Sequence, residues 1–135
     1  MSELTDFLME HPVDDIRETV RDLSPRLKGF SFQIKAMSGQ EYSDYQRMST
    51  IIGKRGKGGT DFNGKKFNEL VVINHVMTPS FKDAELLKKA GVTTSEQFLY
   101  KSLLAGEINT LAMKIMELSG FHQDMEELVE EGKNY

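Results

Sequence analysis

Alternating apolar and polar residues mark residues 30–36 as a strand. Every second position is apolar there: Phe30, Phe32, Ile34 and Ala36. A period of two is typical of a strand that buries one of its faces. Because a lone strand cannot pair its backbone groups, it needs a neighbour, and residues 16–23 are the nearest candidate. The pattern of residues 16–23 fits either a helix or a strand.

A helix-capping pattern follows this strand directly. In Ser38-Gly39-Gln40-Glu41, the serine hydroxyl and the glutamate carboxylate can each accept a hydrogen bond from a backbone amide that a helix start leaves free. The apolar residues after this box share one helical face: Tyr42, Tyr45, Met48 and Ile52. The sequence therefore predicts a helix that includes Ile52.

Two segments lie outside the predicted core. Residues 53–64 contain five glycines, and Asn63-Gly64 is a strong turn signal, so we expect a flexible loop there. Residues 1–15 carry apolar spots at Leu4 and at residues 7–9 before His11-Pro12 breaks the pattern. This segment is predicted to be an arm that is either mobile or docked on another surface.

Two short helices are predicted after the loop. The first starts at Phe67, although Val71-Val72-Ile73 would also suit a strand. Thr78-Pro79 ends it, because proline disfavours helical geometry in the residue before it. The second can be capped by Ser80 and Asp83, and it closes at Gly91.

Three more helices complete the C-terminal half. Thr93-x-x-Glu96 opens one of them. The next has Glu107 at its start, where a carboxylate meets the positive end of the helix dipole, and it ends at Gly120 with Phe121 folded back over Met116. The last carries Met125, Leu128 and Val129. The 135 residues are thus predicted to form a single α+β domain, with a small antiparallel sheet near the N-terminus and a mostly helical C-terminal half.

The composition is that of an ordinary globular protein, with 39% hydrophobic and 28% charged residues. The absence of cysteine excludes disulfides, thiol nucleophiles and cysteine-ligated zinc, and it fits a reducing cytosol. The longest aliphatic run, residues 70–73, is far shorter than the roughly 20 residues of a membrane span. Three acids, Glu3, Asp6 and Glu10, stand where a secretory signal carries basic residues. We therefore expect a cytoplasmic protein.

The sequence offers no convincing catalytic, cofactor or metal site. Residues 59–65 match the spacing G-x-x-x-x-G-K, but Lys66 stands where a serine or threonine should bind magnesium. The three histidines, His11, His75 and His122, have no partner at the spacing of metal ligands. No nucleophile setting such as G-x-S-x-G occurs. The expectation is a non-catalytic binding protein.

Positive charge gathers in the predicted loop, although the net charge of the chain is −4. Only Phe62 and Phe67 stand nearby to stack on bases, so the pattern serves a solvated linker equally well. Nucleic-acid binding by a small regulatory protein remains the alternative function, through the basic loop Lys54–Lys66, whose basic residues are Lys54, Arg55, Lys57, Lys65 and Lys66.

Eight methionines are the most informative excess in the composition. Methionine is flexible and polarizable, so a methionine-rich surface suits adaptable binding to apolar helices, although the same residues can simply fill a core. The partner-binding groove is expected around Met113, Met116, Phe121, Met125 and Leu128.

Five groups of residues occur in an order and spacing that are more specific together than singly. They are residues 30–36 with 41–42, 79–86 with 90–92, 103–108, 117–121, and 133–134. In this arrangement the chain resembles the XkdN-like phage tail assembly chaperones, including the prophage-encoded YqbN type. It departs from them at Ser24-Pro25-Arg26, where a proline interrupts a stretch that usually ends in Ser-x-Arg.

The resemblance implies a mixed fold, no catalytic residues and no cofactor. It also implies a role in phage tail morphogenesis, in the cytosol of the bacterial host. There the chain would bind the long, helical tape measure protein before tail tube subunits polymerise around it. The tail tube protein is a second candidate partner.

Overall fold

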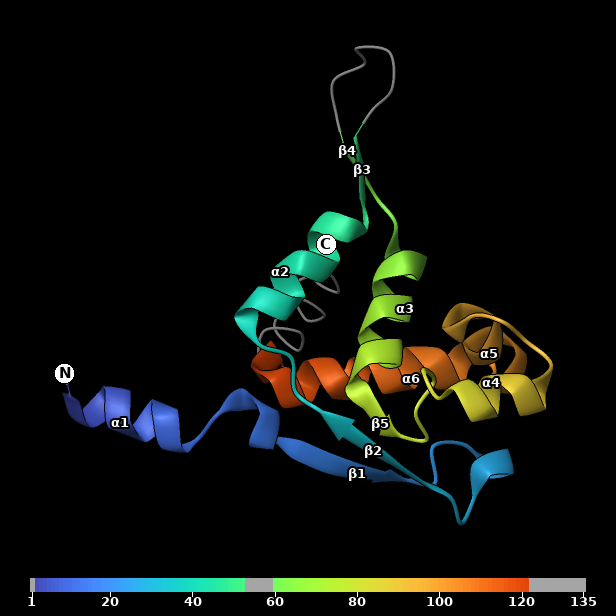
Figure 1. Ribbon diagram of the computed structural model, residues 1–135, viewed down its shortest axis with the longest axis horizontal. Helices are drawn as coiled ribbons and strands as arrows, with labels where there is room; N and C mark the ends of the chain where they lie inside the picture. The colour runs from blue at the N-terminus through green and yellow to red at the C-terminus, as the bar shows by residue number, and fades with distance from the viewer. Residues whose placement is uncertain (1, 53–59, 122–135) are drawn as a thin grey trace, which may run out of the picture.

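The computed structural model describes residues 2–52 and 60–121, and it has the predicted α+β architecture (Figure 1). A three-stranded antiparallel sheet, in the order β1-β2-β5, lies along one side of the molecule, and helices pack against it. Strand β1 (Arg17–Arg21) pairs with β2 (Ser31–Lys35) so that Val20 lies opposite Phe32. The ambiguous segment 16–23 is therefore a strand, and the alternation predicted for β2 buries Phe32 and Ile34.

The third strand of the sheet was not predicted. Helix α3 (Gly64–His75) ends three residues earlier than Thr78-Pro79 suggests, and Val76–Thr78 continues as strand β5. This strand pairs with β2, which places Val76 opposite Ile34. Its three residues are too few to show a period of their own, so only their pairing with β2 identifies them as a strand.

Helix α2 (Gly39–Met48) begins at the predicted capping box. The Ser38 Oγ accepts from the Glu41 amide at 3.1 Å, and the Glu41 carboxylate accepts from the Ser38 amide at 3.0 Å. The prediction that Ile52 continues this helix was wrong, because Thr50–Ile52 forms strand β3 and pairs with β4 (Thr60–Phe62). All three residues of β3 are β-branched, and such side chains favour a strand over a helix.

The segment predicted as a flexible loop, residues 53–64, thus has structure at its end. Residues 60–62 form β4, and Asn63 caps α3 by accepting from the Lys66 amide at 3.1 Å. Residues 53–59 lie outside the described part of the chain. Because the residues between the two glycines of G-x-x-x-x-G-K include a hairpin strand, they do not form the phosphate-binding loop that this spacing can indicate.

The short helices begin and end close to the predicted positions. Asp83 caps α4 (Ala84–Ala90), and Gly91 ends it at a φ of +72°. Helix α5 (Ser95–Ser102) starts one residue later than predicted, because Thr94 and Gln97 form its capping box in place of Thr93 and Glu96. Helix α6 (Ala105–Met116) continues into a wider turn over Glu117–Phe121, where Gly120 has a φ of +98°. The predicted helix around Met125 lies outside the described residues.

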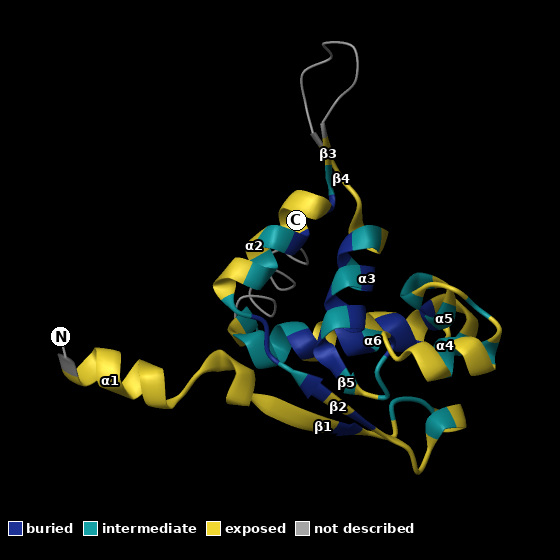
Figure 2. Ribbon diagram, in the orientation of Figure 1, coloured by how far each residue is buried: buried dark blue, intermediate teal, exposed yellow. Residues whose placement is uncertain are grey.

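The core forms where α3 crosses α6 above the sheet. Its fully buried members come from every layer: Ile34 of β2, Val71 and Val72 of α3, Leu99 of α5, and Leu111 and Ile115 of α6. The N-terminal helix α1 (Ser2–Glu10) differs from these elements. It projects from the body, and residues 3–10 are exposed (Figure 2). That this arm is mobile or docks elsewhere stays a prediction.

A buried carboxylate ties the turn after β1 to the start of α6. Glu107 is 3% exposed and accepts from Arg26 Nε at 2.8 Å, from Arg26 Nη2, from the Ser24 hydroxyl and from the Leu104 amide at 2.7 Å. The hydrogen bonds from Arg26, followed by those from Ser24 and Leu104, lower the pKa of Glu107 to about 2 despite its burial. The capping role predicted for Glu107 is confirmed, and Arg26 adds an ion pair.

We expect Arg26→Leu to lower the free energy of unfolding by about 3 kcal/mol at pH 7, since it leaves a buried carboxylate without its counterion. Urea denaturation measures this change. The control is Arg21→Leu, at an exposed position of β1. The pKa of Glu107 is lower in the folded chain than its ordinary value of 4.5, so the stabilisation is complete above about pH 4.5 and is lost as the pH falls toward 2. The difference between wild type and Arg26→Leu should therefore shrink over that range. Equal stability of the two at pH 7 would contradict this account.

A second buried polar contact holds α2 against α3. His75 is fully buried at the end of α3, and its Nε2 lies 2.8 Å from the Tyr45 hydroxyl oxygen. Burial lowers the pKa of His75, and burial together with Glu41 and Asp44 raises that of Tyr45 to about 12, so both groups are neutral near pH 7.

Tyr45→Phe should destabilise the protein by about 1–2 kcal/mol, because it leaves the His75 nitrogen buried without this partner. Thermal or urea unfolding at pH 7 measures the loss. Tyr42→Phe is the matched control, since the Tyr42 hydroxyl accepts an exposed hydrogen bond from Gln46, at 3.0 Å. Similar losses in both variants would mean that the Tyr45–His75 contact contributes nothing specific.

Candidate partner-binding site

One face of helix α6 is exposed and nearly free of charge. Its opposite face carries Ile108, Leu111 and Ile115 into the core. The exposed residues of the helix are Ala105, Gly106, Asn109, Met113 and Lys114, so Lys114 is the one charged residue among them. Met113 is 49% exposed, which shows that it does not serve as a core filler.

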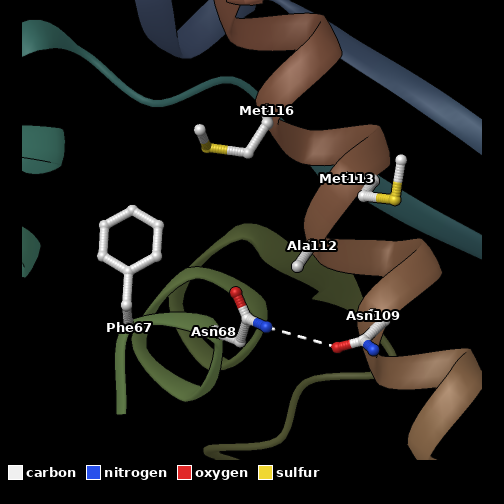
Figure 3. A pocket seen from close by; sticks show the side chains of 6 residues that line it. All are labelled: Phe67, Asn68, Asn109, Ala112, Met113 and Met116. Carbon is white, nitrogen blue, oxygen red and sulfur yellow. Dashed lines mark hydrogen bonds between the residues drawn. The ribbon is translucent and has the colours of Figure 1, made fainter. Parts of the chain in front are cut away.

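Helix α3 forms the second wall of a groove along this face, which we call the α3/α6 groove. Its polar centre is a hydrogen bond of 3.3 Å from Asn68 Nδ2 to Asn109 Oδ1, and a hollow lies on either side. The first hollow, of about 280 Å³, is lined by Phe67, Asn68, Asn109, Ala112, Met113 and Met116 (Figure 3). The second, of about 310 Å³, is lined by Lys65, Asn68, Tyr100, Ala105, Ile108 and Asn109.

A chain of aromatic contacts extends the first hollow toward the neighbouring elements. Phe67 meets Tyr42 of α2 at 5.7 Å and Phe62 of β4 at 5.6 Å between ring centroids. Tyr42 in turn lies 4.8 Å from Phe121, the residue that was expected to fold back over Met116. Phe62 is 56% exposed, so the apolar surface continues onto the hairpin.

The second hollow carries one positive charge at its edge. The Lys65 ammonium lies 4.8 Å from the centroid of the Tyr100 ring, and the Tyr100 hydroxyl donates to Glu69 at 2.7 Å. Burial and the neighbouring Glu69 raise the pKa of Tyr100, so the ring is a neutral phenol against which the ammonium packs.

The structure brings together part of the predicted binding group. Met113 and Met116 line one hollow, and Phe121 connects to it through Tyr42 and Phe67. Met125 and Leu128 lie outside the described residues, as do Lys54, Arg55 and Lys57 of the basic cluster. The whole α3 wall was not predicted from the sequence, and neither were Asn109 and Tyr100. The spacing of Ala105, Asn109 and Met113 could have indicated the exposed face of α6, but no local signal indicates that α3 lies beside it.

In residues 2–52 and 60–121, no three His, Cys, Asp or Glu side chains come close enough together to hold a metal ion. None of the helices in those ranges has the length and apolar character needed to cross a membrane. The groove offers apolar contacts, one amide pair and one ammonium group.

Comparison with known proteins identifies the family. A model of the phage XkdN-like tail assembly chaperone proteins matches residues 4–133. The chain belongs to this family. The crystal structure of the protein YqbN is similar in fold, with a TM-score of 0.61 and 17% identity over 85% of this chain and 93% of that one. No curated protein matches the sequence significantly.

The family resemblance inferred from the sequence is therefore confirmed. As an XkdN-like tail assembly chaperone, the protein has its partners among phage tail proteins.

Proposed function

We propose that this chaperone binds the tape measure protein of its phage through the α3/α6 groove, without catalysis, in the cytosol of the host. The observation that carries the proposal is the exposed, nearly uncharged face of α6, with Asn109 at its centre, a hollow on either side of Asn109, and Met113 lining one of them. An amphipathic helix can lay its apolar face into such a groove. The adaptable methionine side chains suit a partner with many similar helical segments.

The physical task explains why a groove is sufficient. A long helix with exposed apolar residues aggregates in water, and covering that surface until the tail tube assembles requires no bond to be made or broken. The net charge of −4 helps to keep the complex soluble and to repel wrong partners. The tail tube protein is a second candidate occupant, and it serves as a comparison in the binding experiment.

Met113→Glu should weaken binding of tape measure fragments at least tenfold, because it places a charge in the apolar groove; tenfold corresponds to about 1.4 kcal/mol. Co-expression and co-purification with overlapping fragments provide the first measurement, and titration of a retained fragment provides the affinity. Met48→Glu is the matched control, since Met48 is also near the end of a helix, is 56% exposed and lies outside the groove.

Both variants should unfold at the wild-type temperature, since both positions are exposed. Equal binding by Met113→Glu and Met48→Glu would refute the placement of the site. Absence of binding between the wild-type chaperone and every tape measure fragment would refute the proposed partner. Salt-dependent binding of DNA or RNA in an anisotropy assay would instead support the alternative role of the Lys54–Lys66 segment.

A further inference from the structure

The polar centre of the α3/α6 groove has a chemistry that an apolar groove does not require. Asn68 and Asn109 stand between the two hollows and line both of them. Their hydrogen bond of 3.3 Å is long, Asn109 is exposed, and Asn68 is half-buried. In this arrangement, the Oδ1 of Asn68 and the Nδ2 of Asn109 have no hydrogen-bond partner within the described part of the chain. Figure 3 shows the pair at one end of the first hollow.

We propose that the α3/α6 groove selects helices that carry a carboxamide side chain, Asn or Gln, between two apolar side chains. This inference rests on the proposed function, because it names the kind of tape measure segment that the groove accepts. A bound helix would exclude water from the pair, and the oxygen of Asn68 would then need a donor and the amide of Asn109 an acceptor. A carboxamide supplies both from two separate atoms, whereas a hydroxyl must supply both from one oxygen, a carboxylate has no donor and an ammonium group has no acceptor.

The spacing of the two hollows sets the spacing in the bound helix. Along α6, Ala105 lines the second hollow and Ala112 lines the first, with Asn109 between them. Seven helical residues span roughly 10 Å at about 1.5 Å per residue. A helix lying along α6 therefore fills both hollows with apolar residues at positions i and i+7. Its residue at i+3 or i+4 then faces the amide pair, because those positions share the same helical face.

The amide pair imposes selection because of what a wrong residue costs. An apolar side chain over the pair would cover the free oxygen of Asn68 and the free amide of Asn109 without satisfying either, and unsatisfied buried polar groups are costly. A site built to hydrogen-bond its ligand discriminates more strongly than an apolar pocket does. Lys65 adds a second filter, since its charge at the second hollow disfavours a basic residue there.

The test uses synthetic peptides of about 20 residues, which span about 30 Å as helices and cover the tape measure protein in overlapping steps. Anisotropy measures their binding to the full-length chaperone. We expect the retained peptides to contain Asn or Gln at i+3 or i+4 between apolar residues at i and i+7. Replacing that carboxamide by Leu should weaken binding about tenfold, whereas the same replacement of a polar residue on the opposite face should not.

The complementary change is made in the chaperone. The double variant Asn68→Leu/Asn109→Leu should bind the natural peptide about tenfold more weakly and the Leu-substituted peptide as well as wild type binds the natural one. Such an exchange of preference cannot arise from a general loss of folding. Asn109→Asp provides a second variant that keeps the size of the side chain and removes the free donor; it too should weaken binding of the natural peptide.

The outcomes separate this inference from the proposed function. If no tape measure peptide binds the wild-type chaperone, the proposed function fails. If peptides bind and Met113→Glu weakens them, but Leu in place of the carboxamide leaves affinity unchanged, only the selection by Asn68 and Asn109 is overturned. Retained peptides that lack a carboxamide at i+3 or i+4 would overturn it equally.

Discussion

The packing of α3 across α6 is the contact on which the rest of this structure depends. Val71 and Val72 of one helix and Leu111 and Ile115 of the other are fully buried, and the sheet closes over them through Ile34. The same crossing creates the candidate binding groove, because the first turns of α3 stand beside the exposed face of α6 (Figure 3). The two faces of α6 therefore have separate tasks. One stabilises the fold, and the other remains available to a partner.

Glu107 ties the start of α6 to the connection between β1 and β2. Its partner Arg26 is 81 residues away in the sequence, in the turn that follows β1. Pro25 begins a short 3-10 turn, Pro25–Leu27, and its two neighbours in the sequence, Ser24 and Arg26, both donate to Glu107. A buried carboxylate needs such partners, so the start of α6 and the β1–β2 connection fix one another.

A groove of this kind suits a transient chaperone because its parts differ in rigidity. The floor consists of helical residues anchored in the core, whereas Met113 and Met116 line the groove with flexible side chains. The Asn68–Asn109 pair adds directional hydrogen-bonding groups to a surface that otherwise offers apolar contacts. In the proposed function, release requires only that the tail components offer the tape measure protein a better apolar surface than this groove.

The sequence by itself determined the features whose signals lie within a few residues. The alternation in residues 30–36 predicted β2, the capping box at Ser38 and the stop at Gly91 predicted helix ends, and ordered short stretches indicated the family. Tertiary structure alone decided which segments meet: β5 against β2, β3 against β4, Arg26 on Glu107, and α3 beside α6. Hydrogen-bond caps and side-chain periods are local, so they can be read along the chain. Contacts between distant segments depend on the packing of the whole core, and no short stretch of sequence specifies them.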